Sequence, residues 1–153
     1  MRRMPSNKKP SKKYRPKYAK GQIPVTIRHS ADSDLHLQVI PHQELESLRD
    51  GTATEYAYNT LSLRLNWGYV MAGEIFDNPD ARQVMEAGLA AIRGVRERFE
   101  RVGKYGVSGE EFKSLGEALN LTDEMQKSAT RREQHQALRV VYAVNDLKQK
   151  GVL

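Results

Sequence analysis

Residues 79–102 read PDARQVMEAGLAAIRGVRERFERV, and their apolar positions recur every three or four residues. These positions are Ala81, Met85, Gly88, Ile92, Val95, Phe99 and Val102. The opposite side carries Arg and Glu, which is the pattern of an amphipathic helix. Asn78 and Pro79 are typical of a helix start, and Gly103 is typical of a helix stop. The stretch therefore predicts one long helix whose apolar face packs against another helix.

A second long helix is expected directly before this one, over residues 53–76. Thr52 and Glu55 have the spacing of a capping box at its start. Its apolar residues form two stripes, one through Leu61 and the other through Trp67. A helix that is apolar on two sides is expected at the centre of a fold, or under another chain. Because the turn to the next helix is so short, we expect the two helices to form an antiparallel hairpin.

Capping boxes also mark the starts of two further helices. Ser108 and Glu111 precede a helix that runs to about residue 127, and Thr130 and Glu133 precede one over residues 131–149. The side chains expected to be buried in these two helices are Phe112, Leu115, Leu119, Thr122, Met125, Ala137, Val140, Val141, Val144 and Leu147. With no convincing sheet, the sequence indicates an all-α protein.

The region between residues 21 and 51 allows two interpretations. Apolar and polar residues alternate around Ile23, Val25 and Ile27, and again around Leu35, Leu37 and Val39. Each group could be a short extended segment, or the second could begin a helix that Pro41 kinks. From Pro41 to Gly51 we expect a short helix. The predicted fold is a bundle of four main helices, or five with this short one, in a single helical domain over residues 21–153.

Residues 1–20 form a basic arm that we expect to be extended. They contain nine Lys and Arg, three Pro and no acid, which leaves 16 Lys and Arg in residues 21–153 against all 19 Asp and Glu. The net charge of +6 therefore belongs to the arm. Spaced cations suit phosphates, and tyrosine rings among them can stack on bases. The candidate nucleic-acid-binding residues are Lys8, Lys9, Lys12, Lys13, Tyr14, Arg15, Lys17, Tyr18 and Lys20. The alternative is a solvated tail, or one that docks on acidic protein.

Residues 115–122, LGEALNLT, resemble the first helix and turn of helix-turn-helix regulators. A recognition helix would then begin with Asp123 and Glu124, which would face phosphate. The sequence therefore favours an uninterrupted helix.

Aromatic residues outside the arm are candidates for partner contacts, because aromatics with a polar group are common at interfaces. Helical spacing places Trp67 in the core. Tyr105 lies on the connector between two predicted helices, beside Gly106, and we expect it on the surface as a partner-binding residue.

The sequence contains no pattern typical of catalysis. There is no Cys, which excludes disulfides and thiolate zinc sites, and the four His residues lack metal-ligand spacing. A glycine-rich phosphate loop and a GxSxG motif are missing. No apolar run approaches the roughly 18 residues of a membrane span, and the N-terminus lacks the apolar stretch of a signal peptide. We expect a cytoplasmic protein that is not an enzyme and uses no cofactor, metal or membrane.

Several short blocks together resemble uncharacterised small helical proteins encoded in proteobacterial phages, prophages and plasmids. The blocks are KKYRPK at 12–17, DGTATE at 50–55, GKYGVSG at 103–109 and ALNL at 118–121. The resemblance spans nearly the whole chain and implies a bacterial cytosolic setting and a mobile-element origin. It implies no activity and no functional residues.

The leading hypothesis is a non-enzymatic accessory or regulatory protein of a mobile element. Its arm would bind DNA or RNA, while its helical body forms a homo-oligomer or docks on a protein partner. The alternatives are an adaptor or inhibitor of a host enzyme, acting through the exposed face of the central hairpin, and a virion component.

Overall fold

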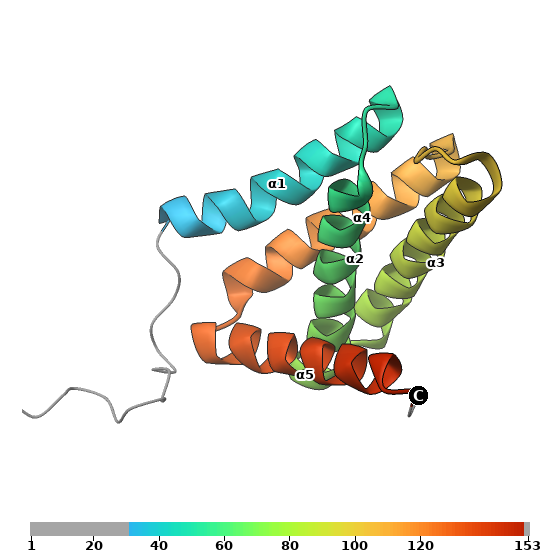
Figure 1. Cartoon of the computed structure of the whole chain (residues 1–153). Coiled ribbons are helices and arrows are strands. Elements are labelled where there is room, and N and C mark those ends of the chain that lie inside the picture. Colours follow the sequence, from blue (N-terminus) through green and yellow to red (C-terminus); the bar gives the residue numbers. More distant parts are fainter. Residues whose placement is uncertain (1–30, 152–153) are drawn as a thin grey trace, which may run out of the picture.

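The computed structural model describes residues 31–151, with side chains from residue 36 onward, and they form five helices (Figure 1). These are α1 (Ala31–Asp50), α2 (Glu55–Val70), which continues as the π-helical turn η1 (Met71–Ile75), α3 (Pro79–Val102), α4 (Gly109–Ser128) and α5 (Arg131–Gln149). No strand occurs among the described residues, so the all-α prediction is confirmed. The extended segment expected around Ile23, Val25 and Ile27 lies outside them.

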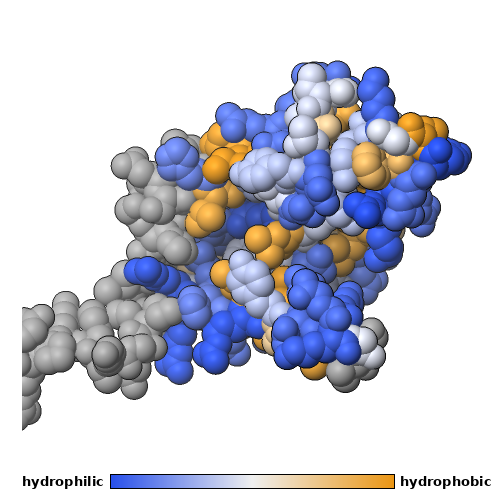
Figure 2. Space-filling view, in the orientation of Figure 1, coloured by the Kyte–Doolittle hydropathy of each residue, from blue (hydrophilic) through white to orange (hydrophobic). Residues whose placement is uncertain are grey.

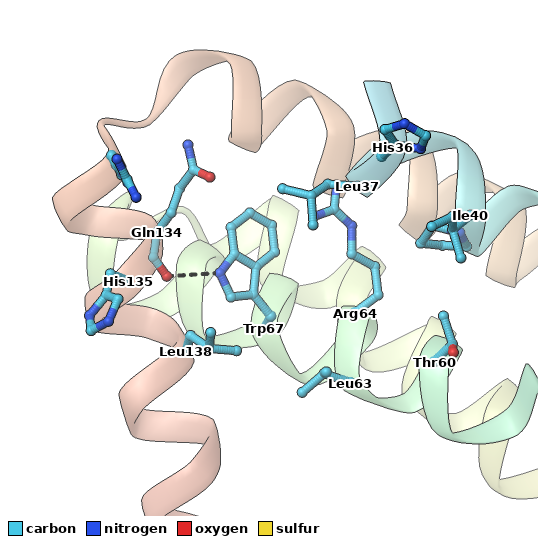
Figure 3. Close-up of a pocket in the computed structure, with 12 residues that line it drawn as sticks. His36, Leu37, Ile40, Thr60, Leu63, Arg64, Trp67, Gln134, His135 and Leu138 are labelled. Atoms are coloured by element: carbon cyan, nitrogen blue, oxygen red, sulfur yellow. Dashed lines mark hydrogen bonds between the residues drawn. The ribbon is translucent and has the colours of Figure 1, made fainter. Parts of the chain in front are cut away.

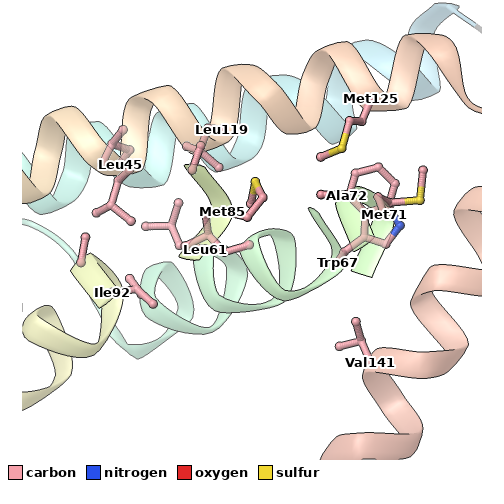
Figure 4. Close-up of a cluster of buried hydrophobic side chains, with 14 of the residues drawn as sticks. Leu45, Leu61, Trp67, Met71, Ala72, Met85, Ile92, Leu119, Met125 and Val141 are labelled. Carbon is pink, nitrogen blue, oxygen red and sulfur yellow. The ribbon is translucent and has the colours of Figure 1, made fainter. Parts of the chain in front are cut away.

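Helix α2 lies at the centre of the bundle and packs against α1, α3, α4 and α5. Its Leu61 and Leu65 are fully buried and join Met85 of α3 and Leu119 of α4 in one apolar cluster (Figure 4). The predicted central position of this helix and its antiparallel hairpin with α3 are confirmed. The second apolar stripe is only partly covered, because Leu63 remains 37% exposed.

Helix α1 is longer than the sequence suggested, because it continues through Pro41. The expected helix start at Pro41 is therefore wrong, and the alternative of a helix that begins before Pro41 is confirmed, since residues 35–40 are helical. Proline removes one backbone donor from a helix interior. Leu45 and Leu48 are buried in the core, and this packing holds the second half of α1 in place. Leu37, in the first half, is 44% exposed. Gly51, at a φ of 77°, ends the helix as predicted.

The turn between α2 and α3 is as predicted. Asn78 caps α3 by accepting a hydrogen bond from the Ala81 amide at 3.1 Å, and Pro79 is the first helical residue.

The capping box expected at Thr52, at the start of α2, is wrong, because the N-cap is Thr54 and its side chain makes no capping hydrogen bond. The predicted helix over 53–76 is thus a shorter α-helix followed by η1.

The connection from α3 to α4 is fixed by local polar contacts. Gly103, at a φ of 73°, ends α3, and Ser108 and Glu111 form the predicted capping box. The Glu111 carboxylate also accepts from Arg98 of α3 at 2.9 Å and 3.1 Å. Burial raises the pKa of Glu111, but the hydrogen bonds from Arg98 and the Ser108 amide outweigh it, so the pKa is below its ordinary value. The capping box at Thr130 and Glu133 is confirmed as well.

The close crossing of α3 and α4 depends on Gly88. A Cβ atom added there would lie 2.6 Å from the Ala118 Cβ, which is fixed to its own backbone. We expect Gly88→Ala to destabilise the protein by about 1–3 kcal/mol, because overpacking outweighs the gain in helix propensity. Gly116→Ala is the matched control, since its nearest neighbour would be the Leu45 Cδ2 at 4.0 Å. Urea unfolding followed by circular dichroism should show the control unchanged or stabilised by up to about 1 kcal/mol; equal effects would contradict the packing explanation.

Candidate functional site

The predicted nucleic-acid-binding residues belong to the arm and lie outside the described residues. They are Lys8, Lys9, Lys12, Lys13, Tyr14, Arg15, Lys17, Tyr18 and Lys20. Their contact with nucleic acid stays a prediction. The described part of the chain begins at Ala31, so the arm is joined to the helical body through the N-terminal end of α1.

The prediction that Tyr105 lies on the surface is wrong. Its side chain is only 6% exposed, and its ring stacks on Phe99 with centroids 4.1 Å apart and on Tyr58 at 6.0 Å. The connector folds back over the helices because Arg98 donates a hydrogen bond to the Gly106 carbonyl at 2.7 Å. Tyr105 is therefore a core residue of this fold and presents no free surface to a partner.

Helix α4 contains no helix-turn-helix motif. It runs without interruption from Gly109 to Ser128. Asn120 lies in the middle of the helix, and its side chain is exposed to solvent. The preference for an uninterrupted helix is confirmed. Over residues 31–151 no three His, Asp or Glu side chains gather as metal ligands, and none of the described helices has the length and apolar character needed to span a bilayer.

An apolar groove lies between α1 and α5, and we call it the α1–α5 groove. Its volume is about 520 Å³. Helix α2 forms the floor, because α1 packs on α2 and α4 while α5 packs on α2 and η1. The space-filling view shows this hollow with apolar residues at its margins (Figure 2). Its lining residues are His36, Leu37, Ile40, Pro41, Thr60, Leu63, Arg64, Trp67, Arg131, Gln134, His135 and Leu138.

Trp67 is fixed at the floor of the groove. Its indole Nε1–H donates a hydrogen bond to the Gln134 carbonyl at 3.1 Å. The Gln134 side chain donates in turn to the carbonyls of Gln126 and Ala129, each at 3.2 Å. These bonds hold the start of α5 on α2. Figure 3 shows Trp67 at the centre of the site, with Leu37 on one side and Leu138 on the other. The predicted burial of Trp67 is confirmed, since it is 6% exposed.

Arg64 places a desolvated cation in the same floor. Its side chain is 10% exposed, its guanidinium lies 4.7 Å from the centre of the Trp67 ring, and Nη2 donates to Asp123 Oδ1 at 3.1 Å. Asp123 Oδ2 also accepts from His42 Nε2 at 2.8 Å. Burial lowers the pKa of Arg64, and the bond to Asp123 offsets part of this, so the guanidinium remains charged. Its buried Nε has no acceptor among the described residues.

The charged groups that line the groove have one sign. Arg64 and Arg131 are cations, and none of the twelve lining residues is Asp or Glu. Low-dielectric walls focus the field of such groups. The α1–α5 groove is thus apolar with a cationic character.

The outward side of α5 carries a second cationic surface, which we call the α5 cationic face. It consists of Arg131, Arg132, His135 and Arg139, all exposed and within about a third of the helix circumference at 3.6 residues per turn. The three arginines make no ion pair with any described residue. By contrast, arginines paired with acids on the body are Arg49, Arg64, Arg82, Arg96 and Arg98. His135 of this face and His36 of α1 both line the α1–α5 groove.

Sequence inspection missed both surfaces. The α5 cationic face has a sequence signal, namely Arg131, Arg132 and Arg139 at positions that share one helical side, with no acid on that side before Asp146. The groove has no sequence signal, because its walls come from helices about a hundred residues apart in the chain.

Comparisons of the chain with protein-family models, curated proteins and solved structures found no match in any of the three.

Proposed function

We propose that this protein is a non-enzymatic accessory or regulatory protein of a mobile element, and that it binds nucleic acid through its arm and the α5 cationic face together. One observation supports the proposal most. Three arginines that make no ion pair with a described residue, Arg131, Arg132 and Arg139, gather on one side of α5. The exposed cations of α5, together with the nine cations in the sequence of residues 1–20, can contact a phosphate backbone.

Such contacts imply binding with little sequence selection. Lys and Arg that neutralise phosphates fix the position of a protein on nucleic acid, whereas sequence is read at base edges. The two arm tyrosines, Tyr14 and Tyr18, add stacking that suits unpaired bases. The proposed activity is therefore general binding of DNA or RNA, with a preference for single strands from the tyrosines.

The exposed face of the central hairpin is a poor docking surface for the alternative function of adaptor. Part of its charge is neutralised within the face, because Arg82 pairs with Glu86 and Arg96 with Glu100 along α3. If the body binds a protein, the apolar groove is the better surface.

A charge reversal on α5 tests this proposal. We expect the double variant Arg132→Glu with Arg139→Glu to bind duplex DNA about 50-fold more weakly at about 0.1 M salt. At this salt concentration each lost phosphate contact lowers the logarithm of the binding constant by about 0.9. The slope of log affinity against log salt should become shallower by about 1.8. Fluorescence anisotropy with labelled DNA and RNA measures both quantities.

The matched control is Arg93→Glu with Arg101→Glu on α3. These arginines are also exposed and make no ion pair within the described residues, but they lie on another helix. The control should lose far less affinity and keep the parent slope. Equal losses in the two variants would show a response to net charge alone and would overturn the role of the α5 cationic face.

A further inference from the structure

We propose that the α1–α5 groove binds an acidic amphipathic helix of a protein partner. The proposal does not depend on nucleic-acid binding, because it concerns the apolar residues of the groove and the cation in its floor. The proposed occupant is a helix with apolar side chains on one face and carboxylates beside them.

The shape and lining of the groove fit a row of apolar side chains. Leu37 of α1 and Leu63 of α2 are 44% and 37% exposed, and Leu138 of α5 is half-buried. A volume of about 520 Å³ falls within the range of about 300–1,000 Å³ that is usual for ligand sites. Since α2 forms a continuous floor between two helical walls, a helix can place residues i, i+3 or i+4, and i+7 along it.

The charges of the groove select an acidic helix. Arg64 and Arg131 line it without any acidic lining residue; Arg64 is paired with Asp123, whereas Arg131 makes no ion pair with a described residue. Arg64 is nine-tenths buried and keeps one donor, Nε, without an acceptor among the described residues. A carboxylate at the rim would gain from this field, whereas a cationic segment would be repelled. The same sign argues against the arm as the occupant, since its nine cations would meet the cations of the groove.

A second copy of the chain fits less well. The exposed apolar row on α5, formed by Val140, Val144 and Leu147, lies on the helix that carries the cationic face. The acid of α5 on the side of this row is Glu133, and its carboxylate is engaged in the Thr130 capping box, so the row lacks the flanking carboxylates of the proposed occupant. Self-association is therefore an outcome that would contradict the proposal.

Trp67 provides a direct probe, because it is the only tryptophan in the chain and lies at the groove floor. Full-length protein is titrated with a synthetic helical peptide that lacks tryptophan, carries Leu at i, i+3 and i+7, and has Glu at the flanking positions. A second peptide has Lys in place of each Glu. We expect a saturable change in Trp67 emission with the Glu peptide and at least tenfold weaker binding of the Lys peptide. Equal binding of the two peptides, or no saturable change, would overturn the proposal.

Two variants separate binding in the groove from other effects. Leu37→Asp should abolish the response to the Glu peptide with only a small loss of stability, because Leu37 is 44% exposed. Val102→Asp, at an apolar residue of α3 that is 59% exposed and not among the lining residues, should bind like the parent. Thermal unfolding confirms that both variants are folded. Binding of the Glu peptide by Leu37→Asp would contradict the proposal. Self-association of the parent protein in sedimentation, if Leu37→Asp abolishes it, would contradict the proposal as well.

Discussion

Deletion of residues 1–20 is expected to lower the affinity for duplex DNA by about 10,000-fold at about 0.1 M salt. The segment holds nine cations, and five phosphate contacts already correspond to more than four log units at this salt concentration. The deletion also reverses the net charge, from +6 to an excess of three acids. Helix content should not change, because all five helices lie within residues 31–149. Anisotropy titrations and circular dichroism measure the two results.

A chain with the arm residues in shuffled order is the matched control for this deletion. It keeps every cation and both tyrosines, so we expect it to bind with nearly the parent affinity if charge and stacking act without sequence selection. Loss of binding in the shuffled chain would indicate a folded recognition segment. A truncated chain that retains the parent affinity would remove the arm from the proposed function.

The parts of the fold that follow from local chemistry could be predicted from the sequence. The apolar period of α3, its Asn78 cap and its Gly103 stop, and the capping boxes at Ser108 and Thr130 depend only on neighbours within four residues. Each of these features is present in the structure. The central position of α2 was also predictable, since a helix apolar on two sides needs covering on two sides.

The predictions that were wrong concern features that depend on packing between distant segments. Pro41 has a strong local preference against a helix interior, yet the burial of Leu45 and Leu48 in the core keeps the helix continuous around it. Tyr105 lies on a connector, which locally suggests exposure, but Phe99 and Tyr58 form a site into which its ring stacks. In both cases the contacts that decide the outcome come from other elements.

The burial of side chains in α5 was likewise only partly predictable from the sequence. The period of the helix predicts a buried row, but only Ala137 and Val141 are buried, while Val140, Val144 and Leu147 stay more than a third exposed. Periodicity identifies which side of a helix is apolar, and it does not tell how far the neighbouring helices extend along that side. The α1–α5 groove arises in the same way, from two helices that share a floor.

Removal of the Asp123 carboxylate is expected to cause the largest loss of stability of any single substitution proposed for this protein. Asp123→Ala should lower the free energy of unfolding by about 3 kcal/mol, because it leaves the Arg64 guanidinium, whose side chain is 10% exposed, without its counter-ion. His42 loses its partner as well. Urea unfolding measures the loss. The neighbouring acid serves as control, since Glu124 pairs with Lys127 at the surface and Glu124→Ala should cost less than about 0.5 kcal/mol.

A double substitution tells whether the loss comes from the unpaired cation or from the missing pair. Breaking a buried ion pair is costly mainly because one charge stays uncompensated, whereas apolar replacement of both partners is often neutral. We therefore expect Arg64→Met with Asp123→Leu to unfold within about 1 kcal/mol of the parent. A double variant as unstable as Asp123→Ala would mean that the pair itself stabilises the fold.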